Sequence, residues 1–366
     1  MKVTFPHFGN TFFAAKAAFD GLGIDYAVPP LCNKEALEIG SYYSPEEMCL
    51  PFKIMIGNYI QGIKEGADTV LTTGSCGPCR FGEYCELQMD ILKKLGYDVD
   101  FIVFDAPKAI GKEEFLRRVS LISNASSKSN NEQIEAALNG LKVINLIDDI
   151  EKIAHIKCGY EINKGESKKI LNSCKREIYS INNPEEVVKR LHEYKRKIKS
   201  VPIDLNKKPI TVGIVGEIYT IAEPFSNLYI EDKLMDYGVC IKRKLSPSWW
   251  VKNTIMSAIN MQSLDIRLAS RKYLPLYIGG HGRECVGETV LSKREGCDGV
   301  IQIFPLGCMP EIVSKSILPT VSKDLNMPVM TLIVDEMTGE TGYMTRIEAF
   351  LDLLERRKSN NVLSWS

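Results

Sequence analysis

The sequence predicts an α/β protein with two Rossmann-like lobes, each built on a parallel sheet, and a helical middle segment. Short apolar runs alternate with stretches of helical periodicity near the start of the chain, and the same alternation resumes near Lys207. The segment between them is rich in Lys, Glu, Ser and Asn. We therefore expect a first lobe at 1–106, a helical insertion or bridge at 107–207 and a second lobe at 208–366. The two sheets are expected to face a central cleft.

The elements of the first lobe follow from apolar runs and turn signals. Strands are predicted at 3–5, 68–73 and 100–105, where short runs of apolar and β-branched residues occur. Helices are predicted over Thr11–Leu22, which ends in a glycine-containing turn, and over Leu87–Leu95. Alternation of this kind gives a parallel sheet with helices on its faces.

The middle segment combines helical periodicity with the polar loop SNASSKSNN at 123–131, so we expect solvated helices there. The second lobe opens with the strongest strand pattern in the chain, PITVGIVG at 209–216. Three further strands are predicted at 274–279, 299–304 and 329–334. A helix over Arg346–Arg357 then precedes a polar tail.

Composition limits the class of protein. The chain has 366 residues, of which 45% are apolar and 25% are charged, as in ordinary globular proteins. Basic and acidic residues balance at 46 each, so neither a nucleic-acid nor a membrane partner is indicated. Pro6, Asn10 and Lys16 interrupt the apolar N-terminal residues, which argues against a signal peptide. No apolar run approaches the ~18 residues of a membrane span, so we expect a cytoplasmic protein.

The chain contains eleven cysteines. In a reducing cytoplasm cysteines do not form a disulfide framework, and an odd number of cysteines also argues against one. Five cysteines occur singly among apolar or helical residues, and we expect them to be small buried side chains. These five are Cys32, Cys158, Cys174, Cys240 and Cys297.

Three other cysteines are each followed by a proline two residues later: Cys49, Cys76 and Cys308. The stretch GSCGPCRFGEYC, which contains the second of these, also supplies Cys79 and Cys85. In an open α/β sheet, sites form beyond the carboxyl ends of the strands. The runs around Cys76 and Cys308 both follow a predicted strand, so both are expected at such an end.

The start of a helix is the expected place for two of these cysteines. Ser44 to Glu47 has the form of a capping box with proline at the first helical position, and Cys49 follows it. Cys308 precedes Pro310 and Glu311, another pattern typical of a helix start. A helix N-terminus carries unpaired N–H groups and the positive end of the helix dipole. It therefore stabilises thiolates and an anionic cluster bound to them.

A weak internal repeat, which we call the internal echo, relates the sequences of the two lobes. EGAD at 65–68 leads into a strand and then GSCGP, and EGCD at 295–298 leads into a strand and then LGCMP. In both places a helix ends, a strand runs, and a Cys-x-Pro follows the strand. This similarity indicates an internal duplication.

Three kinds of cysteine chemistry compete for these residues. Structural zinc usually shows paired CxxC knuckles, but here Cys76–Cys79 is the sole CxxC and the four histidines are scattered. A redox dithiol would use this CGPC but leaves Cys49 and Cys308 unexplained. An iron–sulfur cluster takes thiolates from distant segments and accounts for all three Cys-x-Pro turns. The pattern favours the cluster and leaves zinc and the dithiol open.

Four blocks of the sequence carry a family resemblance: MCLPFK at 48–53, GSCGPCRFGEY at 74–84, GGHGRECVGE at 279–288 and FPLGCMPEIVSKSILP at 304–319. They resemble the family related to the activases and D-components of 2-hydroxyacyl-CoA dehydratases. That superfamily includes the benzoyl-CoA reductase subunits and the double-cubane cluster proteins. The resemblance covers both lobes, and its last block is the most specific.

The resemblance implies an oxygen-sensitive iron–sulfur cluster of the [4Fe-4S] or double-cubane type. Carried over by motif, Cys49, Cys76 and Cys308 match the cysteines that hold a cluster in this superfamily, and Cys79 is the expected fourth ligand. Cys285 and Cys85 come next, because a double cubane needs about that many ligands.

The resemblance also implies partners. Such proteins receive low-potential electrons from a separate ATP-hydrolysing activase, and relatives work as dimers of similar subunits. The chain has no GxxxxGK[ST] phosphate loop, which agrees with a separate ATPase. We therefore expect a homodimer that reduces a small substrate, as an acyl-CoA dehydratase, acyl-CoA reductase or double-cubane reductase component does. The alternative is a non-catalytic cluster or zinc protein that assembles, stores or senses.

Overall fold

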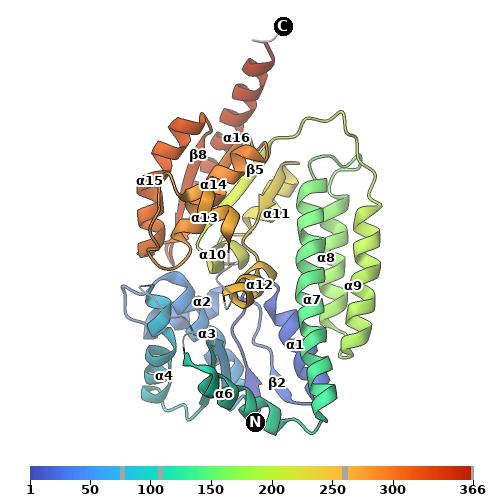
Figure 1. The fold of residues 1–366 in the computed structure, drawn as a ribbon, viewed down its shortest axis with the longest axis vertical. Helices are drawn as coiled ribbons and strands as arrows, with labels where there is room; N and C mark the ends of the chain where they lie inside the picture. The colour runs from blue at the N-terminus through green and yellow to red at the C-terminus, as the bar shows by residue number, and fades with distance from the viewer. Residues whose placement is uncertain (75–78, 106–109, 258–262, 364–366) are drawn as a thin grey trace. The chain divides into compact units, whose positions relative to one another are not determined.

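The computed structural model describes residues 1–74, 79–105, 110–257 and 263–363, and its chain divides into two compact units. Each unit holds a four-stranded parallel sheet (Figure 1). The predicted α/β class with two Rossmann-like lobes is therefore confirmed. Unit 1 consists of Met1–Asp149, Ser173–Lys195 and Pro247–Gln262, and unit 2 of Ile150–Asn172, Arg196–Ser246 and Ser263–Ser366.

The sheet of unit 1 has the strand order β2-β1-β3-β4. Its strands are β1 (Lys2–Thr4), β2 (Asp25–Ala27), β3 (Thr69–Thr73) and β4 (Asp100–Phe104). Val3 in β1 is paired with Tyr26 on one side and Thr69 on the other. The chain thus builds outward from β1 in two directions, and the change of direction falls between β1 and β3. Such a switch point is where open α/β sheets bind ligands.

The helices that accompany this sheet are α1 (Thr11–Leu22), α2 (Lys34–Tyr43), α3 (Leu50–Lys64), the 3-10 helix η1 (Arg80–Glu83), α4 (Tyr84–Lys94) and α6 (Lys112–Ala125). Helix α1 has the predicted bounds, and it ends at Gly23 in the left-handed conformation that glycine adopts without strain. Helix α3 is buried from Leu50 to Gly62, so it is the central helix of the unit.

Two glycines let α2 and α3 approach until their backbones touch. A Cβ added at Gly57 of α3 would lie 1.9 Å from the carbonyl oxygen of Ala36 in α2. In the reverse direction, a Cβ at Gly40 of α2 would lie 1.7 Å from the carbonyl oxygen of Lys53 in α3. Real Cβ atoms do not approach an oxygen so closely, so both positions require glycine. This contact fixes the segment between the two helices, which carries Cys49.

The described residues of the predicted helical middle form α6 and three further helices: α7 (Asn130–Lys157), α8 (Glu166–Tyr179) and α9 (Pro184–Lys199). Helices α7, α8 and α9 lie side by side (Figure 1), joined by hydrogen bonds from Lys195 to Asp149 and from Tyr194 to Glu177. The predicted polar loop is shorter than expected, since α6 continues to Ala125 and α7 begins at Asn130.

The sheet of unit 2 has the order β6-β5-β7-β8. Its strands are β5 (Thr211–Gly216), β6 (Cys240–Arg243), β7 (Gly299–Pro305) and β8 (Val329–Val334). Every residue of β5 and β7 is buried, as expected for central strands with helices on both faces. Its helices are α10 (Ile218–Ala222), α11 (Ile230–Asp236), α13 (Leu264–Ser270), α14 (Gly282–Arg294), α15 (Met309–Leu325) and α16 (Glu340–Leu363). Helix α12 (Pro247–Ser257) belongs to unit 1.

Two sequence predictions about local structure are wrong. Residues 274–279 do not form a strand: Pro275 has no N–H for a sheet, and the side chains of Leu276 and Tyr277 are mostly exposed. Ser44 does not begin a helix. It is the C-cap residue of α2, where its N–H donates to the carbonyl of Gly40, and a turn follows before α3.

Candidate metal centre

Cys49 occupies the N-cap position of α3. Its backbone is extended, with φ −71° and ψ 155°, and its carbonyl accepts the helix's first hydrogen bond from Phe52 N–H at 3.0 Å. Pro51 lies in the first turn, where its missing N–H costs nothing. The predicted helix-start position of this cysteine is therefore correct, although the capping box predicted upstream is not. The cysteine sulfur lies at the positive end of a fifteen-residue helix.

Cys79 occupies the N-cap position of η1, also in an extended conformation. Two contacts join the segment that follows Cys79 to the segment that carries Cys49. The Arg80 guanidinium donates to the carbonyl of Glu47, and the Tyr84 hydroxyl is hydrogen-bonded to the Cys49 sulfur. Two predicted ligand segments, thirty residues apart in sequence, therefore lie next to each other in unit 1. Cys76, the remaining predicted ligand of this unit, lies outside the described residues.

The chain is closely packed at the carboxyl end of β3, where the sequence that contains Cys76 begins. Strand β3 ends at Thr73, and Gly74 N–H donates to the carbonyl of Phe104 at 3.0 Å. A Cβ at Gly74 would lie 2.1 Å from a carboxylate oxygen of Asp105, so this glycine lets the backbone pass close to β4. Arg118 holds that carboxylate with a 2.7 Å ion pair. The run from Gly74 to Cys79 thus begins at the carboxyl end of a central strand.

Cys308 occupies the equivalent position in unit 2. It is the N-cap residue of α15, its side chain is 8% exposed, and Pro310 lies in the first helical turn. Gly307, with φ +79°, makes the sharp turn after β7, and the carbonyl of Cys308 accepts from Ile312 N–H at 2.9 Å. The predicted location after a strand and at a helix start is correct.

The two sheets have the same topology. With strands ranked by their order within each unit, both sheets run 2-1-3-4. The Gly74-to-Cys79 run follows the third strand of unit 1, and Cys308 follows the third strand of unit 2. The internal echo in the sequence therefore corresponds to one topological position used twice, at the switch point of each sheet.

Cys85 and Cys285 differ from the helix-start cysteines. Burial raises the pKa of the Cys85 thiol to about 11, and it raises the pKa of the Cys285 thiol well above its usual value. Cys285 is fully buried in α14, and the negative charge of Glu311 adds to the rise in its pKa. A metal ligand must be a thiolate, and these surroundings favour the neutral thiol.

The five cysteines predicted to be small buried side chains are all buried, which confirms that expectation. No described cysteine forms a disulfide. Burial raises the pKa of Cys158 and of Cys174 to about 12, so these thiols are inert packing groups.

A group of buried carboxyls behind Cys308 escaped the sequence reasoning. Glu311, in the first turn of α15, is 1% exposed, and burial raises its pKa to about 8. Burial also raises the pKa of Glu217, Glu284 and Glu288. Burial lowers the pKa of His281, the N-cap residue of α14, to about 4. From the sequence, Glu311 was expected only to favour the start of its helix. Its burial depends on packing between α14, α15 and β7 that the sequence pattern does not encode.

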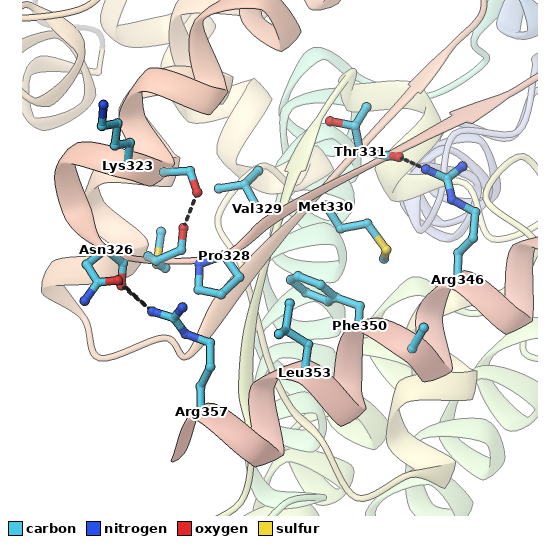
Figure 2. A pocket seen from close by; sticks show the side chains of 13 residues that line it. Lys323, Asn326, Pro328, Val329, Met330, Thr331, Arg346, Phe350, Leu353 and Arg357 are labelled. Carbon is cyan, nitrogen blue, oxygen red and sulfur yellow. Dashed lines mark hydrogen bonds between the residues drawn. The ribbon is translucent and has the colours of Figure 1, made fainter. Parts of the chain in front are cut away.

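A groove in unit 2 lies at the opposite end of the sheet from Cys308. It encloses about 850 Å³ at the start of β8, beside the end of α15 and along α16 (Figure 2). Met330 and Phe350 line it, and Arg346 and Arg357 lie on either side of them. Strands β7 and β8 are parallel, so a groove at the beginning of β8 is remote from a cysteine after the end of β7. None of the predicted ligands lines it.

The residues present fit an iron–sulfur cluster in their chemical kind. Each of the three described ligand candidates is a cysteine at a helix start, where N–H groups can donate to thiolates and cluster sulfide. Within the described parts of the chain, no group of three or more His, Cys, Asp or Glu side chains is arranged to hold a metal ion. Cys76 lies outside those parts.

Comparison with known proteins adds no family assignment. No protein-family model matches the chain, and a search of curated proteins found no match. Among the described residues we also find no helix whose length and apolar content would let it span a bilayer.

Proposed function

We propose that this chain is an iron–sulfur protein that accepts low-potential electrons from a separate ATP-hydrolysing activase and passes them to a small substrate. A [4Fe-4S] or double-cubane cluster would be held by Cys49, Cys76, Cys79 and Cys308. When bound, the cluster supplies a one-electron carrier of low potential. The observation that carries the proposal is the repeated placement of cysteine at a helix start beyond the sheet's switch point, together with the sequence resemblance.

The positions of the other groups support this division of roles. The left-handed turn at Gly307 would let backbone come close to whatever Cys308 binds. The buried Glu311 is held three residues after Cys308, so an acid that keeps its proton at neutral pH lies on the same helix turn. A reductase that adds electrons to a substrate also has to supply protons, and a neutral carboxylic acid is a suitable donor.

The proposal is tested first by metal analysis. The protein is purified without oxygen, and iron, acid-labile sulfide and zinc are measured per chain. We expect brown protein with iron and sulfide in similar amounts. Colourless protein with one zinc per chain would favour the alternative, a zinc-binding protein that assembles or senses. A matching activase with ATP should then reduce the cluster, and turnover of a substrate separates a catalyst from a carrier.

The ligand set is tested by single substitutions. Iron per chain is measured for Cys49→Ala, Cys76→Ala, Cys79→Ala and Cys308→Ala, and each is expected to lose or convert the cluster. Cys174→Ala is the control, because that thiol is fully buried and serves packing. Under the dithiol hypothesis only Cys76 and Cys79 would matter. Full iron content in Cys308→Ala would exclude a role for unit 2 in the cluster.

The proposal includes a homodimer in the cytoplasm. Light scattering of the anaerobic, iron-loaded protein measures its mass directly. A mass near twice the 41.1 kDa of one chain is expected. A strictly monomeric, cluster-loaded protein would contradict this part of the proposal and leave the ligand set intact.

A further inference from the structure

We propose that Tyr84 is a positioning residue for Cys49, holding its sulfur in place and donating a hydrogen bond to it when that sulfur is a thiolate. The inference rests on the proposed function, which makes Cys49 a ligand. Tyr84 is not one of the proposed ligands, and its hydrogen bond would change the reduction potential of the cluster that the cysteines hold. The first of the two measurements below needs no cluster, so the two ideas can fail separately.

The ring of Tyr84 is fixed by its neighbours. Tyr84 is the first residue of α4, and 3% of it is exposed. Phe52 of α3 meets the ring nearly edge-on with the centroids 5.0 Å apart, and Phe81 of η1 packs on it at the same distance. Phe52 is itself fully buried. These two ring contacts restrict the orientation of the phenol, whose hydroxyl is hydrogen-bonded to the sulfur of Cys49.

The backbone of Cys49 is compatible with that contact. As the N-cap residue, Cys49 could have turned its side chain back to an N–H group of α3, but it makes no such capping bond. Its side chain is instead hydrogen-bonded to the hydroxyl of Tyr84. The half-buried sulfur is thus held between the start of α3 and the start of α4. Loss of the Tyr84 hydroxyl would remove this hold while the rings kept the local packing.

The direction of the hydrogen bond follows from acid strength. A phenol titrates near pH 10 in water, whereas a metal-bound cysteine is a thiolate with no proton to give. In that state Tyr84 can only donate. A hydrogen bond to a charged acceptor is about twice as strong as one between neutral groups. Hydrogen bonds to cysteine sulfur are among the features that set the potential of iron–sulfur clusters.

Helix α3, which begins after Cys49, provides a matched control. Tyr59 lies in α3, is fully buried, and its hydroxyl donates to Oγ1 of Thr72 at 3.0 Å. Tyr59→Phe therefore removes one buried tyrosine hydrogen bond from the same unit and leaves the bond to Cys49 in place. Tyr84→Phe removes the bond to Cys49. Any difference between the two variants reports the sulfur contact and not the general cost of losing a hydroxyl.

The first measurement uses protein stripped of metal and reduced. Iodoacetamide alkylation of Cys49 is followed by peptide mass spectrometry as a function of pH. For Tyr84→Phe we expect the pH of half-maximal alkylation rate to rise by about one unit, because the thiolate loses a donor. Tyr59→Phe should match the unsubstituted protein. Replacing Tyr84 by 3-fluorotyrosine, a stronger donor of the same shape, should move the profile the opposite way.

The second measurement uses the iron-loaded protein. Iron content should be unchanged in Tyr84→Phe, since no ligand is removed. Reduction of the cluster should become about tenfold less favourable, a shift of about 59 mV for a one-electron couple. The shift is expected because the reduced, more negative cluster gains more from the donor. Redox titration followed by electron paramagnetic resonance measures it.

The outcomes are distinguishable. If the unsubstituted protein binds no iron, the proposed function fails, and the alkylation profile still decides whether Tyr84 holds Cys49. If iron is present but Tyr84→Phe matches Tyr59→Phe in both measurements, the inference about Tyr84 is overturned. If Tyr84→Phe does not fold, the fluorotyrosine protein provides the test, and an unchanged alkylation profile in it would also overturn the inference.

Discussion

The amide of Gln302 donates to the carboxyl of Glu311, with 2.8 Å between Nε2 and Oε2. Thr331 fixes the amide's orientation, because its hydroxyl donates to Oε1 of Gln302 at 3.0 Å. Neither Gln302 nor Glu311 is more than 1% exposed. A protonated Glu311 therefore carries its proton on Oε1, the oxygen for which the described residues provide no hydrogen-bond partner.

This arrangement predicts a pH-dependent stability. Burial raises the pKa of Glu311 from 4.5 to about 8, so above pH 4.5 the unfolded chain releases this proton more readily than the folded one. The contribution of Glu311 to stability is then fully present below pH 4.5 and is lost as the pH rises to about 8. Glu311→Gln should remove the loss, and at pH 9 its free energy of unfolding should exceed that of the unsubstituted protein by a few kcal/mol.

Urea unfolding at pH 5 and at pH 9 checks this prediction. The exposed Glu355 of α16 provides the control, since Glu355→Gln should leave the pH dependence unchanged. If Glu311→Gln and the unsubstituted protein lose the same stability between the two pH values, the carboxyl is ionised in the folded protein and the prediction is wrong.

A second prediction concerns Arg243 in unit 2. Its guanidinium pairs with Glu231 at 2.7 Å and with Glu151 at 2.9 Å, and all three side chains are largely buried. Arg243→Ala removes the guanidinium that pairs with both carboxylates, and removing one partner of a buried ion pair typically costs about 3–5 kcal/mol. Denaturant unfolding measures the loss. Arg190→Ala, in an exposed group of ion pairs on α9, should cost less than about 1 kcal/mol. Equal losses in the two variants would contradict the prediction.

A third prediction tests the contact between α2 and α3. Gly57→Ala places a methyl group 1.9 Å from a backbone oxygen, so the helices must separate and the free energy of unfolding should fall by several kcal/mol. The matched substitution is Gly342→Ala in α16, where an added Cβ meets nothing within 4 Å. There alanine favours the helix by up to about 1 kcal/mol. Thermal unfolding of both variants should therefore shift in opposite directions.

A fourth prediction concerns the outer edge of the sheet in unit 2. The carbonyls of Pro328 and Val334 accept from β7 and its following turn, so the carbonyl of Thr331 points to the open side of β8. Arg346 of α16 donates to it at 2.6 Å (Figure 2). Unpaired strand edges promote association of chains, and a charged group placed over the edge opposes it.

We expect Arg346→Ala to aggregate faster than the unsubstituted protein at the same temperature, with little change in unfolding temperature. Static light scattering during mild heating measures the rate. Arg356→Ala, at an exposed position of the same helix, is the control. If both variants aggregate at the rate of the unsubstituted protein, Arg346 does not protect the edge.

Local sequence signals predicted much of the fold. The helix over Thr11–Leu22 has its predicted bounds, because an apolar face and a terminal Gly23 both favour them. Proline two residues after Cys49 and Cys308 indicated helix starts, since proline is favoured in the first turn of a helix. These features depend on residues close together in sequence.

Other features depend on contacts between distant segments and were not predictable in this way. Strands β2 and β6 are three and four residues long. In so few residues the alternation of apolar and polar side chains that indicates a strand cannot be recognised. The contact of Tyr84 with Cys49 requires α3 and α4 to be placed against each other. The burial of Glu311 requires Gln302 on a neighbouring strand. A glutamate in a first helical turn otherwise indicates only a favourable charge.

The path of the chain through its two units has a practical consequence. Unit 1 and unit 2 are each assembled from three separate segments, and the chain passes from one to the other at 149/150, 172/173, 195/196, 246/247 and 262/263. No single cut of the backbone, by protease or by gene truncation, can therefore release either unit whole. A fragment ending anywhere in the middle of the chain lacks part of both units. Expression of a half-length chain is accordingly expected to give unfolded material, and experiments on either cysteine site require the full chain.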